Sequence, residues 1–406
     1  MAQSSNETLR DSQLKIVDRQ VNILLENYRR SKMSDTEFWN TQYDLGLAWV
    51  HFPEGLGGLG VSPSFQEQVD GRLREAGAPS NFLGNPIGIG MGAPTVVSYA
   101  SANLARTLLK PIFNCEEIWC QLFSEPGAGS DVASLRTHAT RDGDEWIVNG
   151  QKVWTTLAHT SRWGMLIART DTLAPKHAGM TYFIVDMHTP GIEVRPLRQI
   201  TGDAEFNEVY FTDVRIPDFH RLGGIGEGWK VALTTLMNER VSLGGTVAGR
   251  ESGSIGDAME LWRNSPFKLA SDRDKICQLW IEAEVSRLTN IRASQLRMAG
   301  NPGPEGSIGK LVSAELNKKI YEFCINALGA KGLVYSNYEM KRPETIKIEL
   351  ADGGIDLPKM FLRSRANTIE GGTSEIMRNI LGEMVLGLPR EPKVDSGKVP
   401  SEPTKS

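Results

Sequence analysis

Apolar residues recur at helical spacing through much of the first 120 residues. Within residues 12–28 they stand one, three or four positions apart among charged side chains, at Leu14, Val17, Val21, Leu24 and Leu25. Segments rich in Gly and Pro interrupt this pattern at 53–63 and 78–94, and apolar runs with helical spacing return at 96–119. Side chains spaced in this way line one face of an α-helix. Residues 1–120 are therefore predicted to form an N-terminal helical domain.

Short runs typical of β-strands replace the helical pattern from Gln121 onward. They are separated by turn residues and lie at 145–148, 163–167, 181–185, 192–194 and 208–211. A turn at Asn149-Gly150 should separate the first run from another short strand, which is rich in Trp and Thr. We expect an antiparallel β-domain over residues 121–225.

The helical period resumes after Gly228 and persists to about residue 386, which predicts a C-terminal helical domain over residues 226–388. The tail at 389–406 is rich in Pro, Lys and Ser and is predicted to be disordered. This order of helices, β-domain and helices predicts a helical body interrupted by a barrel or sandwich. It argues against a doubly wound sheet, in which strands and helices alternate.

Composition narrows the class of protein. A chain of 406 residues is long enough for two or three domains, and 40% hydrophobic with 23% charged residues is ordinary for a globular protein. A net charge of −4 argues against a general nucleic-acid binder.

The four cysteines form no CxxC pair and the six histidines show no ligand spacing, so no metal site is expected. No run of about 18 apolar residues predicts a membrane span, and the polar N-terminus does not resemble a secretory signal. We therefore expect a cytoplasmic protein.

Two glycine-rich segments match nucleotide-binding motifs only loosely. Residues 88–93 read GIGMGA, but no convincing strand precedes them and no acidic residue follows at the distance that a dinucleotide site needs. Residues 302–310 read PGPEGSIGK, where Pro304 takes the place of a required glycine and Leu311 replaces Ser or Thr. A loop leading into a helix is the better interpretation of the second segment.

Two segments, 124–131 and 149–156, contain the residues best suited to bind a cofactor. The first reads SEPGAGSD, a turn whose glycines at 127 and 129 allow backbone N–H groups to approach and cradle an anion. The second reads NGQKVWTT, a strand that carries an aromatic ring and hydroxyl groups. Together they could hold a flat, phosphorylated cofactor. The alternative from spacing alone is a plain β-hairpin with a glycine-rich loop.

These two segments resemble the flavin-binding signature of the acyl-CoA dehydrogenase family. The resemblance continues in register over residues 10–390, at 53–60, 202–217, 226–229 and 369–378. In that family the segment like 202–217 closes the β-domain, the one like 226–229 begins the next helix, and the one like 369–378 closes over the flavin. Several motifs in the right order are more specific than one.

The resemblance implies an α+β fold with an N-terminal helical domain, a middle β-barrel and a C-terminal helical bundle. It implies lipid metabolism by oxidation of an acyl-CoA thioester to the trans-2-enoyl-CoA. In that reaction a carboxylate takes the α-proton while hydride leaves the β-carbon for N5 of FAD. It also implies an electron-transfer flavoprotein or similar acceptor, and a homo-oligomer, either a dimer or a tetramer.

The base that the reaction needs has a candidate in the helical pattern. In residues 229–243, Glu239 is the one ionisable group on a stripe that also holds Trp229, Ala232, Leu236 and Leu243. A buried carboxylate is costly unless it is paired. A salt bridge with a neighbouring element or with Arg240 is therefore the alternative to a catalytic role.

The resemblance weighs Glu239 against Glu370. Most members of the family carry the base just before a Gly-Thr pair near the C-terminus, a position that Gly371 occupies here, one residue after Glu370. A smaller branch, which includes isovaleryl-CoA and long-chain acyl-CoA dehydrogenases, has a small residue there. That branch supplies the base from a Glu-Arg pair on the helix after the β-domain, and Glu239-Arg240 matches that pair. Glu239 is therefore predicted to be the base and Glu370 is the runner-up.

The resemblance also assigns contacts. Those to FAD fall on Gln121, Phe123, Ser124, Gly129, Ser130, Trp154, Thr156, Thr373 and Glu375. Those to the acyl-CoA fall on Ser130, Arg240 and Gly371. Trp154 should cover the flavin, Thr156 should hydrogen-bond near N5, and Ser130 should bond a phosphate or ribose.

The chain departs from the family at one position beside the flavin ring and in the segments that complete the FAD site across subunits. Gln121 replaces the commoner aromatic residue, and the Arg-x-x-Phe clamp is absent, because three residues separate Arg263 from Phe267. Residues 326–332 replace a Gln-x-x-Gly-Gly-x-Gly loop. A flavin oxidase or monooxygenase on the same fold and a non-catalytic subunit of a mixed oligomer stay open as alternatives. The acyl group cannot be inferred from the sequence.

Overall fold

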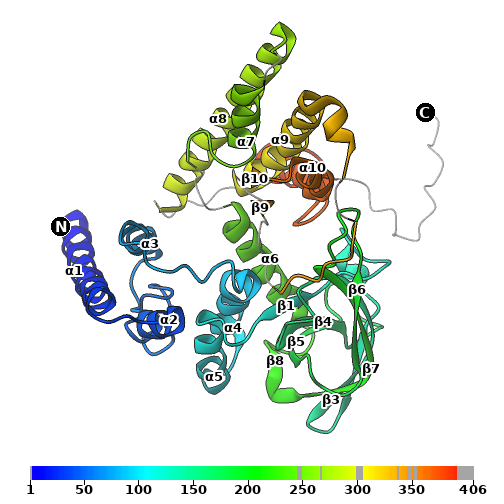
Figure 1. Ribbon diagram of the computed structural model, residues 1–406. Helices are drawn as coiled ribbons and strands as arrows, with labels where there is room; N and C mark the ends of the chain where they lie inside the picture. Colours follow the sequence, from blue (N-terminus) through cyan, green and yellow to red (C-terminus); the bar gives the residue numbers. More distant parts are fainter. Residues whose placement is uncertain are drawn as a thin grey trace, which may run out of the picture.

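A computed structural model describes residues 2–244, 249–265, 268–298, 305–335, 338–344, 350–351 and 354–390. Figure 1 shows N-terminal helices on one side, a β-sheet on the other, and C-terminal helices beyond both. The predicted disordered tail at 389–406 lies outside the described residues except for its first two positions.

The N-terminal part is helical, as predicted, but the helical run expected at 96–119 ends at Phe113 and a strand begins at Trp119. Its α-helices are α1 (Ala2–Arg30), α2 (Asp35–Asp44), α3 (Gln66–Glu75), α4 (Ala93–Tyr99) and α5 (Ala102–Phe113), with a π-helical turn η2 (Gly88–Gly92) before α4. Capping residues set the helix starts: Ser34 and Glu37 form a capping box on α2, and the Ser101 side chain caps α5. The segment 88–93 is therefore helical and opens no dinucleotide-binding turn.

The middle part is an eight-stranded sheet in the order β6-β7-β3-β2-β4-β5-β8, with β1 paired to β4. Its strands are β1 (Trp119–Leu122), β2 (His138–Asp142), β3 (Glu145–Thr156), β4 (Trp163–Arg169), β5 (Met180–Asp186), β6 (Ile192–Leu197), β7 (Phe206–Pro217) and β8 (Arg221–Leu222). All five predicted strand runs are present. Among the described strands no ladder joins β6 to β8, so the strand pairing leaves the expected barrel open there.

Two expectations for the sheet are wrong. The sheet is not wholly antiparallel, because β1 and β2 each pair with β4 in parallel. Asn149-Gly150 forms no turn: both residues lie inside the continuous strand β3, at a shift in its register against β7. A Cβ on Gly150 would lie 2.5 Å from the Thr137 hydroxyl. The glycine therefore serves a close strand contact instead of a hairpin.

The C-terminal part is again mainly helical. It contains α6 (Gly228–Gly244), α7 (Ser254–Asn264), α8 (Ala270–Met298), α9 (Glu305–Leu328), α10 (Leu357–Ser364) and α11 (Ser374–Ile380). Two short antiparallel strands, β9 (Leu350–Ala351) and β10 (Gly354–Ile355), precede α10 and were not predicted from the sequence pattern. Helix α9 begins at Glu305, as expected for a loop that leads into a helix.

Helix α6 lies between the sheet and the C-terminal helices (Figure 1). A Cβ on Gly228, its first residue, would lie 2.7 Å from the Thr181 backbone, so glycine is needed for α6 to approach β5 this closely. One turn before Glu239, the buried Thr235 hydroxyl lies 2.9 Å from the Thr95 hydroxyl and 3.0 Å from that of Tyr182. These hydrogen bonds fix the rotation of α6 against α4 and β5.

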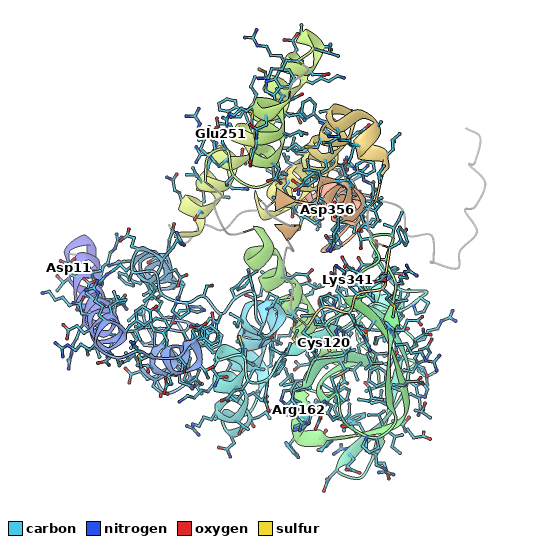
Figure 2. All side chains as sticks on the ribbon, viewed as in Figure 1. Asp11, Cys120, Arg162, Glu251, Lys341 and Asp356 are labelled. Carbon is cyan, nitrogen blue, oxygen red and sulfur yellow. The ribbon has the colours of Figure 1, made fainter. Side chains whose placement is uncertain are left out.

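A segment after α9 also contacts the sheet. Lys341, labelled in Figure 2, accepts a hydrogen bond from the Ala204 N–H through its carbonyl oxygen at 2.7 Å and donates from its own N–H to the Gly202 carbonyl at 3.1 Å. The Arg342 side chain donates to Asn207 at 3.1 Å. Residues 338–344 thus fasten the C-terminal part to the connection between β6 and β7.

Candidate functional site

The turn at 124–131 is closed by its own backbone. The Glu125 N–H donates to the Ala128 carbonyl at 3.1 Å, and the Ala128 N–H donates back at 3.0 Å. Gly127, Gly129 and Ser130 are exposed, and a Cβ on either glycine would meet no atom within 4 Å. The backbone of this turn is thus open to a ligand.

A buried ion pair lies beneath the turn. Lys152 of β3 is completely buried, and its ammonium lies 2.9 Å from a carboxylate oxygen of Glu125. Burial lowers the pKa of Lys152, and the negative charge of Glu125 opposes that shift. Burial raises the pKa of Glu125, but Lys152 and the N–H groups that the carboxylate accepts lower it on balance.

The end of β3 presents an exposed aromatic ring. Trp154 is 61% exposed and has a φ of 60°, which is unusual for a bulky residue. Its ring meets the ring of Phe206 edge-on at 6.1 Å between centroids, and Thr156 pairs with Phe206 across the two strands. An exposed indole face beside an open glycine turn suits a flat, phosphorylated ligand.

Arg363, at the end of α10, connects this strand to the C-terminal loop. Its guanidinium lies 5.8 Å from the ring centroid of Phe206 and 3.4 Å from the Glu205 carboxylate. It also donates to both carboxylate oxygens of Glu370, at 3.1 and 3.0 Å. The two motifs that the sequence singled out, around Trp154 and around Glu370, are thus joined through Phe206 and Arg363.

Glu370 is engaged on both oxygens. Besides the two bonds from Arg363 it accepts one from the Asn367 side chain at 2.8 Å. Burial raises its pKa, but Arg363, Asn367 and Lys310 together hold that pKa below its ordinary value. A carboxylate held in this way is a weak proton acceptor.

Glu239 lies half-buried on α6, one turn beyond Thr235. Burial lowers the pKa of Lys310 on α9, and the negative charges of Glu370, Glu239 and Glu315 oppose that shift. Lys310 therefore lies within electrostatic reach of both candidate bases. The side chain of Arg240 lies outside the described part of the structure.

The other predicted contact residues lie on the elements that the sequence indicated. On β1, Gln121 is half-buried opposite Met165. Just after it, the ring of Phe123 meets that of Tyr182 edge-on at 5.8 Å. The Ser124 carbonyl accepts from the Val153 N–H at 2.9 Å.

In the C-terminal loop, Thr373 caps α11 by accepting from the Ile376 N–H at 3.2 Å, and Glu375 is exposed beside Arg378. Gly371 has a φ of 62°.

Pattern reasoning missed four residues of this site: Lys152, Glu125, Phe206 and Arg363. Lys152 carried a usable signal, because it is the one charged residue between Gly150 and Thr156. The roles of Phe206 and Arg363 depend on contacts 157 positions apart in the chain, for which a single sequence gives no signal.

The described residues fit an FAD molecule. The open turn and exposed Ser130 offer N–H and hydroxyl groups to its phosphates or ribose, and the exposed Trp154 offers a face to its ring system. In the part of the chain that the structure describes, no cluster of three or more His, Cys, Asp or Glu could hold a metal ion. None of the helices there combines the length and apolar character that a membrane crossing needs.

Comparison with known families matches three successive segments. Residues 3–116 match the acyl-CoA dehydrogenase N-terminal domain, 120–214 the middle domain and 226–386 the C-terminal domain. These segments are compatible with the predicted domain boundaries at 120/121 and 225/226, which stay predictions.

Two curated relatives and one solved structure are similar over most of the chain. The acyl-CoA dehydrogenase FadE34 of Mycobacterium tuberculosis is 38% identical over 86% of this chain, which spans only 45% of that longer relative. The acyl-CoA dehydrogenase IpdE1 of the same organism is 36% identical, with 87% of this chain and 88% of the relative covered. The structure named Tcur3481-Tcur3483 steroid ACAD matches with a TM-score of 0.71 at 25% identity, covering 95% of this chain and 98% of that one.

Proposed function

The chain belongs to the acyl-CoA dehydrogenase family, and on that premise we propose that it dehydrogenates an acyl-CoA thioester between the α and β carbons, with Glu239 as the base. Members of this family use FAD. The turn at 124–131, Trp154 and Thr156 would hold the cofactor. When bound, FAD supplies the acceptor for the hydride that leaves the β-carbon.

One observation supports Glu239 over Glu370. Arg363 and Asn367 occupy both oxygens of Glu370 and hold its pKa down, so that carboxylate is poorly suited to take a proton. Glu239 projects from a helix whose rotation Thr95 and Tyr182 fix through Thr235, so its place relative to β5 is defined. A base positioned in a partly desolvated site is what abstraction of an α-proton requires.

The test replaces each carboxylate by its amide. Glu239→Gln should bind FAD and acyl-CoA but fail to bleach the flavin when substrate is added without oxygen. A general base contributes roughly 10²–10⁴-fold in rate, so bleaching should slow by at least that factor. Glu370→Gln is the matched control and should retain most of the bleaching. The opposite pattern would transfer the role of base to Glu370.

The substrate is proposed to carry a bulky, ring-bearing acyl group. The name of the similar solved structure describes it as a steroid ACAD, and that structure covers nearly the whole of this chain. Flavin bleaching should then be faster with a steroid side-chain acyl-CoA than with butyryl-CoA or palmitoyl-CoA. Equal or faster bleaching with either straight-chain thioester would contradict the proposal.

Assembly is proposed to bury an apolar face of α8. Ile281, Val285 and Leu288 share one side of this helix and are 52–57% exposed. We propose an oligomer, either a dimer or a tetramer, that acts in the cytoplasm and passes electrons to an electron-transfer flavoprotein or similar acceptor. Sedimentation that shows a stable 44.8 kDa monomer which retains FAD would contradict the oligomer.

A mixed oligomer is the second candidate, in which this chain supports or completes a homologous subunit. The similar solved structure is named after two proteins, Tcur3481 and Tcur3483, which favours this arrangement. In that case the chain purified alone should hold little FAD and regain it on co-expression with a homologue. Stoichiometric FAD in the chain alone would favour the homo-oligomer.

A further inference from the structure

Both stems of the glycine-rich loop at 126–135 meet at one buried carboxylate. On the incoming stem, Glu125 is itself the carboxylate, and it is 8% exposed. On the outgoing stem, the N–H groups of Arg136 and Thr137 donate to its two oxygens, at 2.6 and 2.9 Å. The loop between these stems carries the exposed residues Gly127, Gly129 and Ser130.

Lys152 of β3 also contacts the Glu125 carboxylate at the base of the loop. Its fully buried ammonium donates to Glu125 at 2.9 Å and to the Phe123 carbonyl at 3.0 Å. Two residues further along β3 stands Trp154, the exposed ring of the same site. The ion pair therefore ties both loop stems to the strand that carries Trp154, beside the hydrogen bond from the Val153 N–H to the Ser124 carbonyl at 2.9 Å.

Stability of the fold alone is a weak reason for such a pair. Moving two charges out of water is costly, and replacing a buried ion pair by apolar residues of similar volume is often neutral or even stabilising. Removing only one partner of the pair, in contrast, leaves an uncompensated buried charge. A buried pair is best explained where a defined geometry depends on it, and here that geometry is the base of the loop.

We propose that Glu125 and Lys152 are positioning residues that clamp the base of loop 126–135 and so preorganise its backbone for the phosphates or ribose of FAD. The inference rests on the proposed function for the identity of the cofactor. The clamp itself is a property of the chain without cofactor. The two parts can therefore be tested separately.

The experiment compares five proteins: wild type, Lys152→Met, Glu125→Gln, the double variant of this pair, and a control variant. Lys110→Met is the matched control, because it removes a lysine from an ion pair with Asp44 at 2.7 Å in the N-terminal domain, where the pair is partly exposed. Each protein is stripped of flavin and titrated with FAD. Thermal unfolding and amide hydrogen exchange of residues 126–135 are measured without cofactor.

A role of the ion pair in positioning the loop and a role only in stabilising the fold predict different results. Both single variants should weaken FAD binding by about tenfold or more, and speed exchange in the loop. The double variant, which has no stranded charge, should regain much of the lost Tm but keep the weak FAD binding and the fast exchange. Lys110→Met should match the wild type in all measurements. Glu125→Gln preserves the shape of the side chain and keeps the test open if Lys152→Met does not fold.

Two results would overturn the inference. Wild-type FAD affinity and loop exchange in the single variants would show that the pair does not position the loop. Recovery of affinity together with Tm in the double variant would reduce the pair to a stabilising contact. A wild type that binds no FAD would refute the proposed function instead. Amide exchange in the flavin-free proteins would still show whether the ion pair clamps the base of the loop.

Discussion

Removing the Arg363 guanidinium should release Glu370 and loosen the C-terminal loop from the sheet. Arg363→Met keeps much of the side-chain volume while deleting the two bonds to Glu370, the ion pair with Glu205 and the contact with the Phe206 ring. Glu205 is largely buried and Glu370 is partly buried, so each would lose an ion-pair partner in partly desolvated surroundings. We therefore expect the variant to be destabilised chiefly through its C-terminal part.

The exposure of the two side chains sets how much free energy of unfolding the ion pair contributes. Arg363 is 28% exposed and Glu370 36% exposed. Breaking a fully buried pair costs about 3–5 kcal/mol, whereas an exposed pair is worth about 0–1 kcal/mol. The present pair lies between these limits, so about 2 kcal/mol should be lost. For a folding unit of about 150–250 residues, this corresponds to a fall in Tm of roughly 4–8 °C.

A double-mutant cycle isolates the pair from the other contacts of Arg363. Thermal unfolding of wild type, Arg363→Met, Glu370→Gln and the double variant should give a coupling free energy of about 1 kcal/mol at pH 7. Because the folded-state pKa of Glu370 lies below its ordinary value of 4.5, its stabilising charge is fully present above that value. The stabilisation is lost as pH falls through the folded-state pKa. The coupling should shrink accordingly in acid.

Strict additivity at pH 7 would refute this reasoning, since it would show that Arg363 and Glu370 do not stabilise each other. A coupling that stays constant below pH 4.5 would show that the carboxylate charge is not what Arg363 recognises. Loss of flavin bleaching in Glu370→Gln with unchanged Tm would also contradict it, because Glu370 would then act in the chemistry and not in the structure.

Three further outcomes are expected. Trp154→Ala should weaken FAD binding roughly 2- to 10-fold by titration while leaving the Tm of the flavin-free protein nearly unchanged, because the ring is 61% exposed. Gly228→Ala should cost about 1–3 kcal/mol in thermal unfolding and slow flavin reduction, because its Cβ would press on the Thr181 backbone and displace α6. Arg221 and Trp146 lower the pKa of Asp218 to about 2, so Asp218→Asn should be less stable than wild type at pH 7. That difference should narrow as pH falls from 3.8 through about 2.

The hydrophobic pattern predicted the elements whose period extends over many residues. The N-terminal helices, the five strand runs and the C-terminal helices are present. Short elements, namely β1, β2, β8 and the paired strands β9 and β10, were missed. Gly150 was misread as a turn residue because the clash that requires glycine comes from Thr137, just before the neighbouring strand β2, and not from local sequence.

In the candidate site, too, local sequence did not reveal contacts between residues that lie far apart in the chain. The turn at 124–131 and the strand at 149–156 were identified from local chemistry, and the turn, the strand end and the C-terminal loop are joined by contacts in the structure. The joining residues, Phe206 and Arg363, lie outside the motifs that first drew attention to these segments. Their positions follow from how α10 packs beside β7, which depends on the whole fold.

The environment of Glu370 also weighs on the choice of base. Before Glu370 could take a proton it would have to leave Arg363 and Asn367, which together donate three hydrogen bonds to it. If that release costs about 2 kcal/mol, the competent form would be about 30-fold less abundant, since 1.4 kcal/mol is a tenfold change. The lowered pKa of Glu370 expresses this same cost, because Arg363 and Asn367 are main causes of the lowering. This cost weighs against Glu370 as the base, and the branch of the family that places its base on the helix after the β-domain is the one that this chain should follow.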